Sequence, residues 1–424
     1  MRQVLKGDIC YSKSPTELEM IPDGYLVCED GFSKGVFPVL PEQYAGWPLT
    51  DYSDCMIIPG LVDLHVHAPQ YAFRGMGMDL ELLDWLNAHT FPGEARYSDP
   101  DYAEKAYSLF VKDLVEGPNT RAVVFATVHV PATLRLMEML EQSGLVTLVG
   151  KVNMDRNSHP GLEEQSAEKS AADTIGWLES CAGRFENTGP ILTPRFTPSC
   201  SDGLMRRLGE IRRKYSLPVQ SHLSENQGEV AWVRKLCPHT SCYGGAYDQF
   251  GLFGGDVPTI MAHCVWSGGE ETALMRRNGV FVAHCPQSNM NLSSGIAPVR
   301  DYLDNGINIG LGSDVAGGCH TSIFRAMSDA VQASKLYWRL VDQESKPLTV
   351  PEAFYLGTLG GGKFFGKVGS FEEGYELDAV VVDDSRIAGP SPIPLAGRLE
   401  RIVYLSDDRD IKAKYARGRA IKVQ

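Results

Sequence analysis

Two histidines at the end of a short apolar stretch are the residues of this sequence best suited to chemistry. Residues 59–67 run from Pro59 through aliphatic side chains to His65 and His67. Side chains two residues apart in a strand point to the same face, so both imidazoles can reach one point in space. Neutral imidazole is the commonest metal ligand, and two imidazoles supply half of a tetrahedral site. The alternative is a pair of ordinary strand histidines.

Other polar residues follow other apolar, strand-like stretches. His222, His263 and Asp314 each come at or just after such a stretch. Each of them alone fits a satisfied polar residue or a loop cap. Together with the first two histidines, they make a suitable ligand set for one divalent ion. The combined pattern therefore predicts a metal site.

The elements that must bring these residues together alternate along the chain. Eight strand-like stretches are separated mostly by amphipathic, helix-like stretches. The strands are expected to end near His67, Val128, Asn153, Pro194, His222, His263, His284 and Asp314. Repeated βα units of this number predict an α/β fold with a (β/α)8 TIM-type barrel. In such barrels the C-terminal strand ends meet on one rim, where the chemistry lies.

Both ends of the chain have a different pattern from the middle. Residues 1–58 contain short β-like pieces separated by Gly, Pro and Asp, and β-like pieces recur at 378–382, 402–405 and 420–423. These pieces predict an accessory β-sandwich formed by both chain termini. The expected domains are residues 1–58 and 367–424 in the sandwich and residues 59–366 in the barrel.

The composition of the chain argues against nucleic acids and membranes as binding partners. The 424-residue chain has a net charge of −13, which argues against nucleic-acid binding and against an anionic membrane surface. No apolar run is long enough to span a bilayer, and the first residues lack the apolar region of a signal peptide. The ten cysteines form no Cys-x-x-Cys pair, so reduced thiols and a cytoplasmic location are expected.

Several motifs carry a resemblance to a known family. The chain resembles the amidohydrolase superfamily, and within it the branch that deaminates guanine. The superfamily-type pieces are the His-x-His strand end and Ser313-Asp314, and the pieces similar to the guanine-specific branch are the Gln70-Tyr71 continuation and Pro194-Arg195-Phe196. Further matching stretches are residues 220–226, 261–263, 283–289 and 404–409.

The resemblance implies roles for the residues at the strand ends. One zinc ion per subunit, with iron left open, is expected on His65, His67, His222 and Asp314. Asp314 would take a proton from the attacking water, Glu225 would shuttle protons to ring N3 and to the departing amine, and His263 would hydrogen-bond the reacting centre. For Glu225 the alternative is a glutamate in a first helical turn that favours the helix dipole. Residues 191–196 contain no lysine, which favours one metal ion over a lysine-bridged pair.

The resemblance also implies a substrate pocket. Arg195 could donate to O6 and N7 of guanine, Gln70 could bind another edge of the ring, Phe196 could pack on a ring face, and His222 would contact the substrate as well as the metal. The alternatives are a surface arginine, a strand-end glutamine and a core phenylalanine.

The expected reaction is hydrolysis of guanine to xanthine and ammonia by a homodimeric enzyme. One alternative is a related deaminase or hydrolase acting on 8-oxoguanine, cytosine, an adenosine-like substrate or a triazine. A second alternative, from a different class, is a metal-free structural relative without activity.

Overall fold

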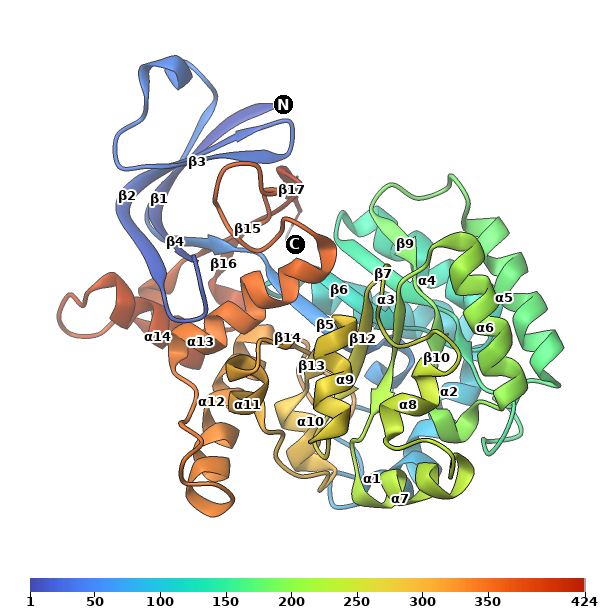
Figure 1. Cartoon of the computed structure of the whole chain (residues 1–424). Coiled ribbons are helices and arrows are strands. Elements are labelled where there is room, and N and C mark those ends of the chain that lie inside the picture. Colours follow the sequence, from blue (N-terminus) through green and yellow to red (C-terminus); the bar gives the residue numbers. More distant parts are fainter. Residues whose placement is uncertain (423–424) are drawn as a thin grey trace.

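A seven-stranded sheet combines strands from the two ends of the chain. The computed structural model describes residues 1–422. The sheet order is β17-β16-β15-β4-β1-β2-β3, and strands β15 and β4 pair antiparallel at its centre (Figure 1). The N-terminal strands are β1 (Arg2–Ser12), β2 (Leu18–Glu29), β3 (Phe32–Phe37) and β4 (Leu49–Pro59). The C-terminal strands are β15 (Ala379–Val382), β16 (Ile411–Ala416) and β17 (Arg419–Ile421). Residue 423, at the end of the expected last strand, lies outside the described residues.

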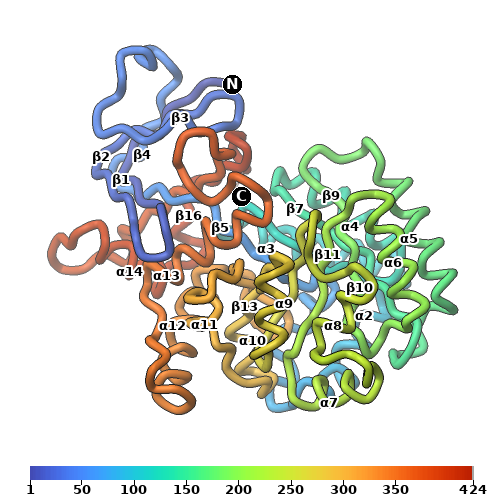
Figure 2. The backbone as a smooth tube through the Cα atoms, viewed as in Figure 1, coloured from blue at the N-terminus to red at the C-terminus, as the bar shows by residue number. Residues whose placement is uncertain are grey.

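The middle of the chain is built from parallel strands with helices outside them, in an arrangement of TIM-barrel type (Figure 2). One sheet contains β5 (Leu61–His67), β6 (Asn119–Phe125), β7 (Val146–Gly150) and β9 (Thr188–Pro190). A second sheet contains β11 (Val219–Leu223), β12 (Thr259–His263), β13 (Phe281–His284) and β14 (Asn308–Leu311). The short strands β8 (Val152–Asn153) and β10 (Thr193–Pro194) pair with each other. The expected alternation of strands and helices is confirmed.

The principal helices follow the strands. They are α3 (Pro100–Glu116), α4 (Val130–Ser143), α5 (Ala167–Cys181), α6 (Asp202–Tyr215), α7 (Gln227–Leu236), α9 (Glu270–Asn278) and α12 (Ile323–Leu340). Ser201 caps α6, because its side chain accepts a hydrogen bond from the backbone N–H of Leu204. Among residues 1–422, no helix combines the length and apolar character that crossing a membrane requires.

Two sequence-based expectations about secondary structure are wrong. Residues 402–405, expected as a strand, form the end of helix α14 (Leu395–Leu405), whose buried positions Leu399, Ile402 and Val403 follow a helical period. The first helical turn offered as the alternative for Glu225 is also wrong, because helix α7 begins at Gln227 and is capped by Asn226. Glu225 therefore lies outside the first helical turn, and the helix dipole does not explain its presence.

Buried charges attach the terminal sheet to the barrel. The Nε atom of Arg121, in β6, donates to Oδ2 of Asp378 over 2.6 Å, and both side chains are buried. The ammonium group of Lys414, in β16, donates to the carbonyl oxygens of Leu114, Gly117 and Asn119 over 2.8–3.0 Å. These three acceptors lie at the end of α3 and the start of β6. The sheet is therefore held at the N-terminal ends of the strands, away from the ends that carry the histidines.

Candidate active site

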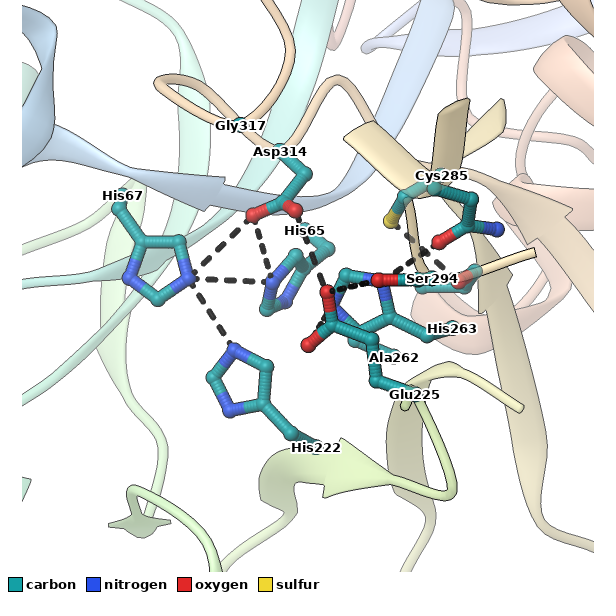
Figure 3. A network of polar contacts seen from close by, with 12 residues as sticks. His65, His67, His222, Glu225, Ala262, His263, Cys285, Ser294, Asp314 and Gly317 are labelled. Carbon is teal, nitrogen blue, oxygen red and sulfur yellow. Dashed lines mark hydrogen bonds and ion pairs between the residues drawn. The ribbon is translucent and has the colours of Figure 1, made fainter. Parts of the chain in front are cut away.

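Three imidazoles converge at the C-terminal ends of two strands. His65 and His67 end β5, and their Nε2 atoms lie 3.2 Å apart. Nε2 of His222, from β11, lies 3.2 Å from Nε2 of His67 (Figure 3). Four-coordinate zinc with ligand bonds of about 2.0–2.1 Å leaves neighbouring nitrogens little more than 3 Å apart. The structure thus brings together three of the four residues expected to bind metal at a spacing that suits one ion.

Asp314 completes this group from the segment after β14. Its Oδ1 atom lies 3.1 Å from Nε2 of His65 and 3.4 Å from Nε2 of His67. Asp63, which the sequence reasoning missed, fixes the distance between the two segments. Its carboxylate accepts hydrogen bonds from the backbone N–H groups of His65 and Ser313 and from the Ser313 hydroxyl. The buried Asp63 side chain therefore aligns the first and last strands beneath the ligand group.

The protonation states favour metal binding. Burial lowers the pKa of His67 and His222 well below the usual value, so both imidazoles are neutral. Burial by itself would raise the pKa of Asp314, but the neighbouring imidazoles outweigh this effect and lower it. Nδ1 of His222 donates to the carbonyl oxygen of Arg195 over 2.6 Å, which leaves the Nε2 lone pair facing the group. Neutral, oriented imidazoles and an ionised carboxylate are the forms that coordinate metals, so these residues fit a divalent cation.

His263 and Glu225 lie beside the ligand group. Nε2 of His263 is 3.4 Å from Oε2 of Glu225 and 3.7 Å from Oδ2 of Asp314. Its Nδ1 atom lies 2.9 Å from Oδ1 of Asn289, so Nδ1 carries a proton. Ser294 donates its hydroxyl to Oε1 of Glu225 over 3.1 Å. Burial raises the pKa of Glu225 to about 7, which suits a group that both gives and takes protons near neutrality.

The backbone at these positions adopts left-handed conformations that side-chain-bearing residues avoid. The φ angles are +47° at Ser224, +72° at His263 and +46° at Asp314. Such conformations cost about 1–3 kcal/mol each and gather at functional sites. They turn the chain sharply as each strand ends, and so direct Glu225, His263 and Asp314 toward one another.

A cavity opens beside the ligand group. All four residues expected to contact the substrate line it: Gln70, Arg195, Phe196 and His222. Arg195 is buried, which excludes the surface-arginine alternative. Phe196 lines the cavity, and its ring packs edge to face with the ring of Trp232. The apolar lining comes from Leu82, Trp85, Leu86 and Leu292. A flat, largely apolar ligand with polar edges suits this combination.

Glu94 joins the two polar side chains of the cavity and was missed from the sequence. It lies in the short helix α2 (Phe91–Ala95) and is buried. Its Oε2 atom accepts from Nη1 of Arg195 over 2.6 Å, and its Oε1 atom accepts from Nε2 of Gln70 over 2.9 Å. The Gln70 carbonyl accepts from the backbone N–H of Ala316. Arg195 and Gln70 are therefore held in fixed orientations by a single carboxylate.

Glu229 was also missed. It lines the cavity, and its Oε2 atom accepts the backbone N–H of Glu225 over 2.9 Å. Its Oε1 atom accepts from the hydroxyl of Tyr243 over 2.7 Å. The only signal in the sequence is its position three residues after Asn226, the spacing of a capping box.

The fold and the site together define a hydrolase of the metal-binding barrel type. The model of the amidohydrolase family matches residues 56–421, and the chain belongs to this family. This agrees with the resemblance inferred from the sequence.

Several proteins similar to this chain are guanine deaminases. The chain is 38% identical to guanine deaminase of Rattus norvegicus over 86% of this chain and 82% of that protein. It is 37% identical to guanine deaminase of Dictyostelium discoideum over 88% of this chain and 84% of that protein. Among solved structures, guanine deaminase from C. acetobutylicum with guanine bound in its active site superposes with a TM-score of 0.96, at 46% identity and over the full length of both chains.

Proposed function

We propose that this protein is an enzyme that hydrolyses guanine at C2, giving xanthine and ammonia. One observation carries the proposal. The cavity places the Arg195 guanidinium and the Gln70 amide beside a group of metal-type ligands, in a chain 46% identical over its full length to a guanine-bound guanine deaminase. Water supplies the oxygen of the new carbonyl, and the amino group leaves as ammonia.

His65, His67, His222 and Asp314 would hold one zinc ion, with iron as the alternative. When bound, such an ion supplies the Lewis acidity that turns water into hydroxide near neutral pH. The short distances among the three Nε2 atoms and Oδ1 of Asp314 support this ligand set.

The protons of the reaction are transferred by side chains of this protein. Asp314 accepts a proton from the attacking water. Glu225 gives a proton to ring N3 as C2 becomes tetrahedral. It then takes the proton of the new C2 hydroxyl and passes it to the departing amine, and Asp314 returns the first water proton to Glu225. Nε2 of His263 lies near both carboxylates, where it hydrogen-bonds the attacking oxygen and stabilises charge that develops there.

The polar groups of the cavity read the purine edge. Arg195 has five N–H donors and uses Nη1 on Glu94, so other donors are available for O6 and N7. Gln70 keeps one amide N–H and one carbonyl lone pair for the ligand. Phe196 offers its ring to a face of the purine. Adenine has an amino group in place of O6, which would leave an Arg195 donor without an acceptor.

The sequence also supports proposals on the domains, the oligomeric state and the location of the protein. The proposed domains are a β-sandwich of residues 1–58 and 367–424 and a closed (β/α)8 barrel of residues 59–366. Support for barrel closure comes from the hydrogen bond of the Asp314 N–H to the carbonyl of His65, which joins the segment after the last strand to the first. We also propose a homodimer in the cytoplasm.

The test is ammonia release and ultraviolet absorbance with guanine, using zinc-loaded wild type beside Glu225→Gln and Arg195→Ala. Wild type should form xanthine, Glu225→Gln should lose about 10²–10⁴-fold in kcat, and Arg195→Ala should lose selectivity for guanine over adenine. Arg234→Ala, which removes an exposed arginine of α7, is the control and should behave as wild type. Turnover of cytosine, 8-oxoguanine, adenosine or a triazine without turnover of guanine would contradict the proposal.

A further inference from the structure

The cavity contains a charged arginine whose charge is balanced within the protein. Arg195 and Glu94 are both buried and form an ion pair of 2.6 Å. The other carboxylates that line the cavity have different partners. Glu225 faces His263, Glu229 accepts from Tyr243, and Asp314 faces His65. Among the described residues, Glu94 is the carboxylate that forms an ion pair with Arg195.

We infer that Glu94 is a positioning residue that neutralises Arg195, so that the cavity prefers the neutral purine substrate and does not retain the more acidic product. This inference rests on the proposed function. It assigns to Glu94 the selectivity between guanine and xanthine, and no part in the chemical step.

The contacts of Glu94 explain the positioning. Gln70 follows β5 and Arg195 follows β10, so the two side chains arrive from different parts of the barrel. Glu94 offers one carboxylate oxygen to each, and Phe91 of the same short helix has its ring centroid 5.4 Å from the guanidinium carbon. Helix α2 thus contacts both donors and fixes where they lie in the cavity.

The chemistry of the product explains the neutralisation. Replacing the 2-amino group of guanine by a second carbonyl leaves a ring N–H on each side of that carbonyl, which makes xanthine the stronger acid. An unbalanced cation beside the ring would favour its deprotonated form. A buried, unpaired arginine would therefore bind the xanthine anion tightly and slow product release. With Glu94 ionised beside it, Arg195 still donates hydrogen bonds but adds little net charge to the cavity.

The experiment compares two inhibitors that share the O6 and N7 edge. Xanthine ionises readily, whereas hypoxanthine, which lacks the 2-oxo group, stays neutral at the same mildly alkaline pH. Inhibition constants for both, with KM and kcat for guanine, are measured on zinc-loaded wild type, Glu94→Gln, Glu94→Asp and Glu81→Gln. Glu81 is an exposed glutamate on the same connection, so Glu81→Gln removes one negative charge without touching the cavity.

For Glu94→Gln we expect xanthine to inhibit at least about tenfold more tightly, a difference of 1.4 kcal/mol, while hypoxanthine binds equally or more weakly. Glu94→Asp keeps the charge, so xanthine should not inhibit more tightly. Its shorter side chain positions Arg195 and Gln70 less well, so KM for guanine should rise. Glu81→Gln should match wild type.

Equal weakening of both inhibitors in Glu94→Gln would mean that Glu94 only supports the fold of the cavity, and would overturn the inference. Unchanged xanthine inhibition would overturn it as well. If Glu94→Gln does not fold, tighter xanthine inhibition in Glu94→Asp would contradict the neutralising role. Failure of wild type to hydrolyse guanine would refute the proposed function instead, and so the two failures are distinguishable.

Discussion

Ser294 is placed to set the pH at which Glu225 changes charge. Its hydroxyl donates to Oε1 of Glu225 over 3.1 Å, and both side chains are buried. The backbone of Ser294 is held independently, because Nε1 of Trp266 donates to its carbonyl oxygen over 2.8 Å. Ser294→Ala should therefore remove one hydrogen bond to the Glu225 carboxylate without changing the backbone conformation at residue 294.

The size of the effect follows from the strength of that hydrogen bond. A hydrogen bond to an ionised group is stronger than one to its neutral form by about 1 kcal/mol. One pKa unit corresponds to about 1.4 kcal/mol, so losing the bond should raise the pKa of Glu225 from about 7 by roughly 0.7 unit. In the proposed mechanism Glu225 gives a proton to the ring, so activity needs its protonated form. The alkaline limb of kcat/KM should therefore move to higher pH by that amount.

The measurement is kcat/KM for guanine as a function of pH, for wild type, Ser294→Ala and the control Ser293→Ala. Ser293 is exposed and adjacent, with a φ of +55° that alanine and serine tolerate equally poorly. Its variant should keep the wild-type profile. An alkaline limb that stays in place or moves to lower pH in Ser294→Ala would refute the assignment of Glu225 as the proton donor.

Three further predictions concern the metal, the pocket and the terminal sheet. His67→Ala should lower zinc content in elemental analysis to well below one ion per chain, because it removes a proposed ligand that lies 3.2 Å from two others; full occupancy would exclude His67 as a ligand. Phe196→Ala should raise KM for guanine about tenfold, the value of one base–aromatic contact, and an unchanged KM would make Phe196 a core residue. Lys414→Met should lower the free energy of unfolding by about 2–4 kcal/mol in denaturant titration, because three buried carbonyls lose their donor. The matched variant of exposed Lys412 should change it little, and equal effects would contradict the reasoning.

Residues at strand ends were predictable because two local rules coincide there. An apolar run marks a buried strand, and a parallel strand of a barrel presents its last residues at the catalytic rim, so His67, His222 and His263 could be grouped without any contact information. The structure brings them together with Asp314 as the pattern predicts. Helix α14 shows the limit of short windows, since Ile402 and Val403 resemble a strand until the buried residue three positions earlier is included.

Residues that support the site were beyond local rules, because their partners are distant in the sequence. Glu94 and Arg195 are separated by 101 positions, and Asp63 and Ser313 by 250. A glutamate beside Phe91 and Pro92 is indistinguishable by composition from an exposed helical glutamate. Its role depends on burial, and burial depends on how the connection between β5 and α3 folds over the barrel.

That connection separates the two tasks of the site. The metal-type ligands and the residues proposed to transfer protons come from strand ends or follow them directly. The carboxylates of Asp63 and Glu229 accept hydrogen bonds from the backbone of this group. The segment between β5 and α3 supplies the apolar wall of the cavity and Glu94, which orients the donors that read the ligand. Because Glu94 accepts hydrogen bonds from the cavity donors Gln70 and Arg195 and from none of the ligand histidines, a change of substrate can arise in this segment without disturbing the hydrolytic group. Selectivity among amino-heterocycles should therefore depend on residues 70–96 more than on the histidines.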